Sequence, residues 1–116
     1  MTVEQIRNTL RAQVLCGEDA LATEVFAACG SDMMSDVLAF AKEQAVLLTG
    51  LINPQVVRTA EMMDMKCVVF VRGKRPGEDV LALARERGII VLCTKFEMFS
   101  SCGLLYAAGL HGGSLR

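Results

Sequence analysis

Three short apolar runs decide the fold: residues 45–50 read AVLLTG, residues 67–73 read CVVFVRG, and residues 89–94 read IIVLCT. None of them alternates apolar with polar residues, which is typical of strands covered on both faces. Two segments with helical patterns, 54–64 and 77–87, separate the three runs. Strands that alternate with helices of this length form βαβ units. The sequence therefore predicts an α/β fold, a small three-layer sandwich with a mainly parallel sheet built from successive βα units.

The residues before position 45 add further elements to this sheet. Thr2 and Gln5 have the spacing of a capping box, which begins a helix over residues 3–10. Short strands are expected over 12–16 and 24–29, with a loop or a single turn between them.

Residue types at the helix ends predict where the remaining helices begin and stop. Ser31 or Asp32 is expected to cap the next helix. Asn53 caps the helix that has Pro54 in its first turn, and Gly88 ends the following helix in a left-handed conformation. A last helix, from residue 96 to about residue 110, is expected to have Thr94 as its cap, and residues 111–113 are expected to fray.

Apolar spacing predicts which side chains of these helices are buried. On the helix after Asp32 the expected buried residues are Met33, Val37, Leu38 and Ala41. A methionine group is interpreted as adaptable core rather than a cofactor site, and it comprises Met62, Met63 and Met65. On the last helix the expected buried residues are Phe99, Leu104, Leu105 and Ala108.

Length and composition limit the classes of protein to consider. A chain of 116 residues fits a single domain, residues 1–116, and its 53% hydrophobic content exceeds the usual 45–50%. The surplus predicts a buried subunit interface and hence a homodimer. The net charge of −1 with scattered basic residues argues against a nucleic-acid partner. No run approaches the length of a membrane span and no signal peptide is visible, so we expect a cytoplasmic protein without membrane contact.

Few residues in this chain could carry catalysis or hold a metal ion. His111 is the only histidine, which excludes a histidine-dependent triad and a multi-histidine metal site. The five cysteines include no pair two residues apart, so we interpret them as buried, reduced thiols. No catalytic residue, metal site or cofactor is therefore predicted.

The carboxyl ends of the three core strands are the place where a ligand is expected, because parallel sheets bind ligands at that edge. The segment Arg72-Gly73-Lys74-Arg75 gathers three cations just before a helix, an arrangement that attracts anions, although a basic loop is commonly only a solvated turn. The known glycine-rich phosphate loops are absent. The candidate ligand-binding residues are Thr49, Gly50, Arg72, Gly73, Lys74, Arg75, Thr94 and Lys95.

From residue 45 to the end of the last helix the pattern resembles the DRTGG domain. The likeness is carried by Val46 to Gly50, Val68 to Pro76 and Gly88 to Phe99, each a strand that runs into a turn and a helix. The resemblance implies a regulatory or dimerising accessory without catalysis, found alone or fused to phosphotransacetylase or to CBS domains. It also extends to the amino-terminal domain of bacterial HPr kinase. Free-standing members occur near iron-only hydrogenase genes, which implies a role in that setting.

The sequence departs from this family at its signature. Leu51 and Ile52 stand where the family tends to have Asp-Arg, and Arg72 to Lys74 stand where it tends to have Thr-Gly-Gly. No site of the family is therefore carried over to this chain.

Two hypotheses of different class follow. The first is a non-enzymatic regulatory or scaffolding module that acts through homodimerisation and a protein partner. The alternative is a small-molecule sensor that binds a nucleotide or other anion at the carboxyl ends of the strands, where we expect the ligand to touch Arg72 or Lys74.

Overall fold

A five-stranded sheet lies at the centre of the computed structural model, which describes residues 1–41 and 44–112. The strand order is β1-β5-β4-β3-β2. Strands β2 to β5 pair in parallel, whereas β1 pairs antiparallel with β5 at one edge. The predicted mainly parallel sheet is confirmed. The strands are β1 (Gln13–Cys16), β2 (Ala27–Gly30), β3 (Ala45–Thr49), β4 (Cys67–Phe70) and β5 (Ile90–Cys93).

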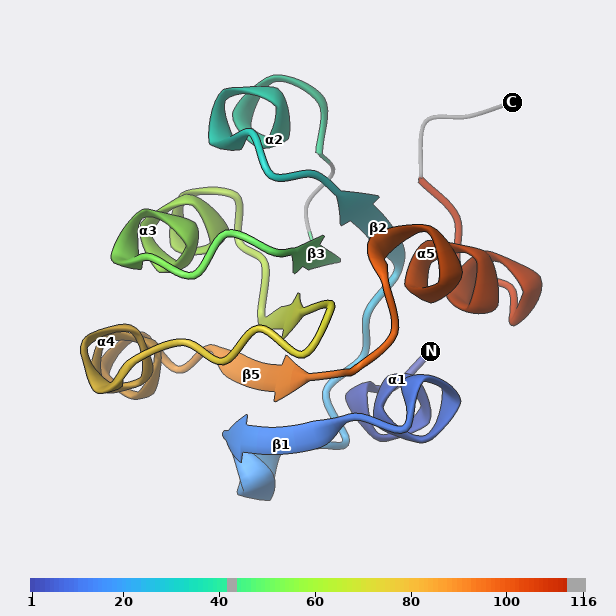
Figure 1. Ribbon diagram of the computed structural model, residues 1–116, viewed down its shortest axis with the longest axis horizontal. Coiled ribbons are helices and arrows are strands. Elements are labelled where there is room, and N and C mark those ends of the chain that lie inside the picture. The colour runs from blue at the N-terminus through green and yellow to red at the C-terminus, as the bar shows by residue number, and fades with distance from the viewer. Residues whose placement is uncertain (42–43, 113–116) are drawn as a thin grey trace.

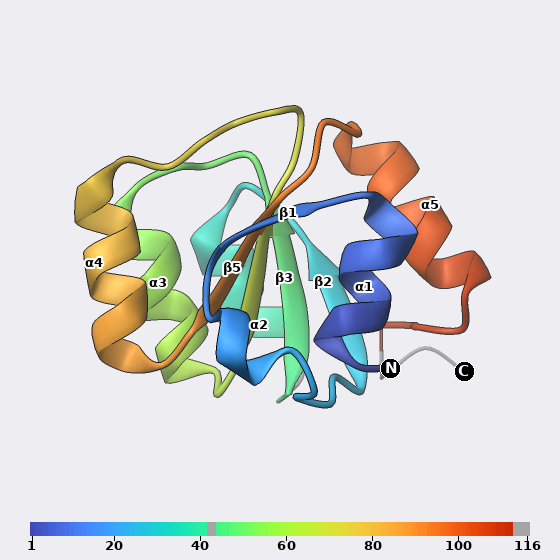
Figure 2. The ribbon, with the colours of Figure 1, turned by 90° about the horizontal axis from the view of Figure 1, so that it is seen from below.

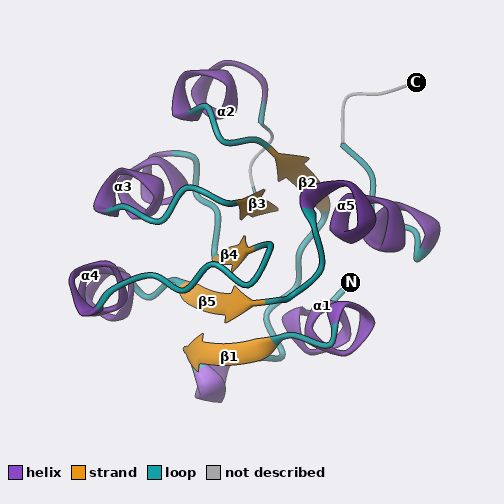
Figure 3. Ribbon diagram, viewed as in Figure 1, coloured by secondary structure: helices purple, strands orange, loops and turns teal. Residues whose placement is uncertain are grey.

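Helices cover both faces of the sheet and make the predicted three layers (Figures 1 to 3). On one face lie α1 (Val3–Leu10) and α5 (Met98–Ala107). The other face carries α2 (Met34–Phe40), α3 (Pro54–Met62) and α4 (Glu78–Arg87). A single 3-10 turn, Glu18–Ala20, follows β1, as expected for that segment. None of the helices in residues 1–41 and 44–112 combines the length and apolar content needed to cross a bilayer.

The unbroken apolar runs of the strands are explained by two separate cores. Leu47 and Val68 belong to the core under α2, α3 and α4, while Val46 and Val69 belong to the core under α1 and α5. Successive side chains of a strand point to opposite faces, so nearly every residue of an inner strand must be apolar when both faces are covered.

Local capping chemistry begins and ends several helices as predicted. The Gln5 amide donates to the Thr2 hydroxyl at 3.2 Å, and the Thr2 amide donates to the Gln5 side chain at 2.8 Å. The Asn53 side chain accepts from the Gln55 amide at 3.0 Å, with Pro54 at the first helical position. Gly88 ends α4 with a left-handed φ of 69°. These ends are therefore set by residues adjacent to each helix.

The predicted strand over residues 24–29 is displaced toward the carboxyl end. In the structure β2 begins only at Ala27, because the Val25 amide donates to the carbonyl of Met1 and Thr2 forms an isolated bridge with Glu24. Glu24 and Val25, which the sequence pattern assigned to a strand of the sheet, thus pair with the amino terminus instead.

The predicted start and buried side of α2 are also wrong. Met33 is the N-cap, and neither Ser31 nor Asp32 bonds to the amides of the first turn as a helix cap does. Met34 and Val37 are buried, whereas Met33 and Leu38 are exposed. The helix begins two residues later than a cap at Ser31 would place it and one residue later than a cap at Asp32 would.

Two other packing predictions are contradicted. Phe99 of α5 is 88% exposed, Leu104 and Ala108 are exposed, and the helix is held on the sheet by Ser101 and Leu105. Helix α5 carries apolar residues around its whole circumference, so spacing could not identify its buried side. The methionine group divides as well: Met65 is buried, but Met62 is exposed.

Candidate functional site

The carboxyl ends of the four parallel strands meet at one edge of the sheet. Because β3, β4 and β5 are adjacent and parallel, Thr49, Arg72 and Thr94 leave the sheet at the same edge, as predicted. The residues at this edge form two arrangements. One is a pocket beside β5 and β1, and the other is a polar cluster after β2 and β3.

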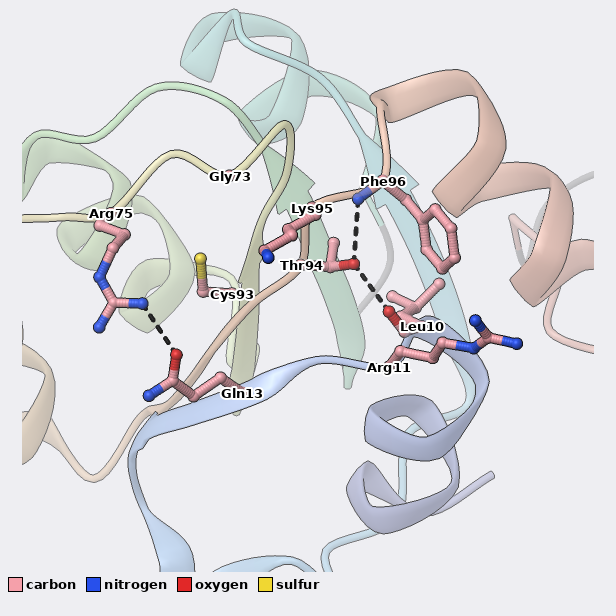
Figure 4. A pocket seen from close by; sticks show the side chains of 9 residues that line it. All are labelled: Leu10, Arg11, Gln13, Gly73, Arg75, Cys93, Thr94, Lys95 and Phe96. Carbon is pink, nitrogen blue, oxygen red and sulfur yellow. Dashed lines mark hydrogen bonds between the residues drawn. The ribbon is translucent and has the colours of Figure 1, made fainter.

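The pocket is a cavity of about 420 Å³. It lies between the end of β5, the turn after β4 and the connection from α1 to β1 (Figure 4). Its lining includes the cationic residues Arg11, Arg75 and Lys95 and the apolar residues Leu10 and Phe96. The other lining residues are Gln13, Gly73, Cys93 and Thr94.

Hydrogen bonds hold the walls of this pocket in place. The buried Thr94 hydroxyl donates to the carbonyl of Leu10 at 2.7 Å and accepts from the Phe96 amide at 3.2 Å. The Gly73 amide donates to the carbonyl of Thr94 at 2.9 Å, and the Arg72 amide donates to that of Phe96 at 2.8 Å. These amides are already engaged, so an anion in the pocket would meet side-chain cations rather than a nest of backbone amides.

The electrostatic character of the pocket is positive. Arg11, Arg75 and Lys95 contribute three cations and no carboxylate lines the cavity. Within residues 1–41 and 44–112 none of the three forms an ion pair. Arg75 Nη1 instead donates to Gln13 Oε1 at 2.9 Å, which fixes the guanidinium at the rim (Figure 4). Arg75 and Lys95 lie toward one end of the pocket and Arg11 lies at the opposite rim (Figure 4), so the end with two cations favours an anionic ligand.

Cys93 contributes a thiol to the pocket wall. Its Sγ donates to the carbonyl of Lys74 at 3.2 Å. Burial raises the pKa of the Cys93 thiol, although the charge of Arg75 opposes that shift. The thiol is therefore mainly protonated and suited to packing rather than to nucleophilic attack.

The second arrangement centres on the Asp32 carboxylate. Asp32 Oδ1 accepts from the Gly50 amide at 2.7 Å and from the Thr49 hydroxyl at 3.0 Å. The bond from the Gly50 amide lowers the pKa of the Asp32 carboxyl; desolvation opposes this, and the Thr49 hydroxyl and the charge of Arg72 lower the pKa further. The carboxylate thus fixes the turn that follows β3.

Arg72 lies directly against Gly50 in this cluster. A Cβ atom added to Gly50 would stand 2.6 Å from Arg72 Nη2, so the absence of a side chain permits the contact. Arg72 also has a left-handed φ of 60°, an uncommon conformation for a residue with a side chain. In this cluster Asp32 is hydrogen-bonded to Thr49 and Gly50, and the Arg72 guanidinium lies against Gly50.

The structure divides the predicted ligand-binding residues between these two arrangements. Gly73, Arg75, Thr94 and Lys95 line the pocket. Thr49, Gly50 and Arg72 belong to the cluster with Asp32. Lys74 does not line the pocket, but its backbone carbonyl accepts a hydrogen bond from the Cys93 thiol.

Sequence reasoning missed residues from the amino-terminal third of the chain. Leu10, Arg11 and Gln13 reach the pocket only because β1 adds to the edge of the sheet beside β5. No local pattern specifies that pairing. The sequence pattern places Asp32 at a helix cap. Its position two residues after the end of β2 is the signal that could have identified its role.

Residues that could hold a metal ion do not gather at this edge. Over the described ranges 1–41 and 44–112, no group of three or more His, Cys, Asp or Glu side chains is arranged to bind one. All five cysteines are free, with Cys29 and Cys102 only half-buried rather than buried as expected.

Comparisons with known proteins identify the family. The structure is similar to that of the CBS and DRTGG domains of the regulatory region of Clostridium perfringens pyrophosphatase, complexed with the activator diadenosine tetraphosphate. The TM-score is 0.73 at 17% sequence identity, over 90% of this chain and 45% of that one, so the likeness shows a shared fold. No match was found among curated proteins. The family model of the DRTGG domain matches residues 5–108, and the chain therefore belongs to the DRTGG domain family.

Proposed function

We propose that this domain is a non-catalytic regulatory module that binds a small anion, of the nucleotide or phosphorylated-metabolite class, in the pocket beside β5. The observation that carries the proposal is the pair of cations, Arg75 and Lys95, toward one end of a cavity with no carboxylate in its lining (Figure 4). A bound anion relieves the repulsion among these charges, and charge-assisted hydrogen bonds to guanidinium and ammonium groups are the strong ones.

A regulatory rather than catalytic role agrees with the lining of the pocket. It includes no histidine and no carboxylate that could act as a general acid or base. Its one thiol, that of Cys93, has a raised pKa and is bonded to a backbone carbonyl. The similar Clostridium perfringens structure is a regulatory region in complex with a nucleotide activator, which supports the same kind of role here.

Thermal unfolding in the presence of candidate anions tests this function. A ligand at a hundred times its dissociation constant adds about 2.7 kcal/mol to the stability of the folded state. For a domain of this size, that free energy raises the Tm by roughly 10 °C. We expect such a shift with pyrophosphate or a nucleotide, and expect the double substitution Arg75→Gln and Lys95→Gln to remove it.

A control with the same change of net charge separates the pocket from the whole-protein field. Arg58 and Lys66 are exposed and lie outside the pocket, so Arg58→Gln with Lys66→Gln should leave the shift in place. An equal loss in both double variants, or no shift with any anion, would contradict the proposed site.

Exposed aromatic side chains favour a second candidate function, homodimerisation with docking of a protein partner. Phe40 of α2 is 73% exposed and Phe99 of α5 is 88% exposed, and these helices flank the edge strand β2 on its two sides (Figure 1). Exposed apolar patches commonly mark protein contacts. Light scattering at tens of micromolar should give the mass of a dimer, and the double change Phe40→Ser with Phe99→Ser should lower it. A monomer of the unaltered protein at that concentration would exclude this function.

A further inference from the structure

The pocket beside β5 has two chemically different ends. The inference drawn from them concerns the same pocket as the proposed function and rests on that function. Figure 4 shows the side chains of Arg75 and Lys95 directed toward one end, near Gly73 and Cys93. The side chains of Leu10 and Phe96 lie at the other end. A ligand that fills the cavity must therefore place an anionic group and an apolar group at opposite ends.

The apolar end is suited to a flat group. Phe96 is half-buried, whereas Leu10 is fully buried, so Phe96 supplies the accessible apolar surface at this end of the cavity (Figure 4). Aromatic rings stack favourably on other planar groups and contribute beyond the area that they bury. The Phe96 backbone is fixed at both polar atoms, because its amide donates to Thr94 and its carbonyl accepts from Arg72. The ring is thus presented from a rigid segment.

The size of the cavity matches a ligand with one such flat group. Ligand pockets span about 300–1,000 Å³, and about 420 Å³ is near the lower end of that range. One nucleoside with its phosphate is enough to fill this space, so a second nucleoside would extend outside it.

We propose that the ligand is a mononucleotide, a nucleoside mono- or diphosphate. Its phosphate lies between Arg75 and Lys95, and its base stacks on Phe96. Arg11 lies at the far rim of this end, beyond Leu10 (Figure 4). Gln13 keeps the Arg75 guanidinium in place through the 2.9 Å hydrogen bond, so it is a positioning residue for the phosphate.

Calorimetric titration of the full chain at fixed ionic strength tests the inference. The probes are the monophosphates and diphosphates of adenosine, guanosine, cytidine and uridine, with pyrophosphate, adenosine and diadenosine tetraphosphate for comparison. We expect at least one mononucleotide to bind tenfold or more tightly than pyrophosphate. Adenosine, which lacks phosphate, and diadenosine tetraphosphate, which has two bases, should bind more weakly than that mononucleotide.

Substitutions at each end of the pocket locate the two parts of the ligand. Phe96→Ala should weaken the mononucleotide by roughly tenfold, as expected for loss of a stacked base, and leave pyrophosphate binding unchanged. Phe96→Leu keeps an apolar side chain and provides a second reading if the alanine variant fails to fold. Phe26→Ala, at an exposed position before β2 and outside the pocket, is the matched control and should change neither affinity. Lys95→Gln should weaken both probes.

The outcomes separate this inference from the proposed function. Suppose that pyrophosphate binds and that its binding depends on Lys95. The mononucleotide assignment is then overturned, while anion sensing stands, if no mononucleotide binds more tightly than pyrophosphate. The same conclusion follows if Phe96→Ala and Phe96→Leu leave the nucleotide affinity unchanged. Tighter binding of diadenosine tetraphosphate than of every mononucleotide overturns the size argument and hence the assignment. If neither pyrophosphate nor any nucleotide binds, both proposals fail.

Discussion

The replacement Asp32→Ala tests whether this carboxylate holds the end of β3. Asp32 accepts two hydrogen bonds, from the Gly50 amide at 2.7 Å and from the Thr49 hydroxyl at 3.0 Å. A hydrogen bond to a charged group contributes about 1.5–3 kcal/mol, but solvent reaches Asp32 and reduces that value. The fully buried Thr49 hydroxyl would lose its acceptor, which adds to the cost. We expect a loss of about 1–2 kcal/mol, or roughly 4–8 °C in Tm.

The pH dependence of this loss follows from the lowered pKa of the Asp32 carboxyl. The ordinary value is 3.8, and the folded state holds the pKa below it. A group with a depressed folded pKa stabilises the protein fully above its unfolded pKa, and that stability is lost as the pH falls through the folded pKa. The difference between the unaltered protein and the Asp32→Ala variant should therefore be constant near neutral pH and shrink below about pH 4.

Urea unfolding monitored by circular dichroism between pH 7 and pH 3 measures both effects. Asp36→Ala is the matched control on the same segment, because Asp36 is exposed and its side chain forms no ion pair within residues 1–41 and 44–112. Its effect should stay within about 0.5 kcal/mol. An Asp32→Ala variant as stable as the unaltered protein would refute the reasoning, and so would a loss that does not change down to pH 3.

Three further predictions concern the glycines and a buried thiol. Gly88→Ala should lower the free energy of unfolding by about 1–2 kcal/mol, because the φ of 69° at this position disfavours a side chain. Gly103→Ala lies inside α5, where an added Cβ would have nothing within 4 Å, and should raise the free energy of unfolding by up to about 1 kcal/mol. Urea unfolding that gives the same sign for both variants would contradict this. Gly50→Ala should displace the Arg72 guanidinium and cost less than about 1 kcal/mol, since the far end of a flexible side chain can move, and a double-mutant cycle with Arg72→Ala should show that the cost depends on that contact. Cys67 is fully buried and burial raises its pKa, so peptide mapping after brief treatment of the native protein with a thiol reagent should find it unlabelled; rapid labelling would show that its strand opens.

Much of the fold could be predicted from the sequence because its strands are covered on both faces. Residues 45–49 and 67–70 must be almost wholly apolar for that reason, and short unbroken apolar runs between helical segments are typical of inner parallel strands. Caps such as Asn53 and Gly88 depend on neighbouring residues alone, so they were predicted correctly. The edge of the sheet that carries the candidate site followed from the parallel arrangement of these strands.

The rest depends on contacts between distant segments. The position of β1 beside β5 brings Arg11 and Gln13 to the pocket, and no residue near position 11 indicates that neighbour. Asp32 follows a strand and precedes a helix, so a helix cap and a bond to the next strand were both consistent with its position, and the structure shows the second. Helix α5, apolar on all sides, gave no periodic signal for the exposure of Phe99.

The most direct test of the proposed site is a map of the residues that respond to an anion. Amide chemical shifts of the isotope-labelled domain, followed during titration with pyrophosphate at constant ionic strength, locate binding without prior choice of variants. We expect the largest saturable changes at residues 10–13, 73–75 and 93–96, which line or border the pocket. Changes concentrated instead around Gly17, Gly88 and Ile89, which line a smaller hollow of about 260 Å³, or no saturable change at all, would contradict an anion site at the carboxyl ends of the strands.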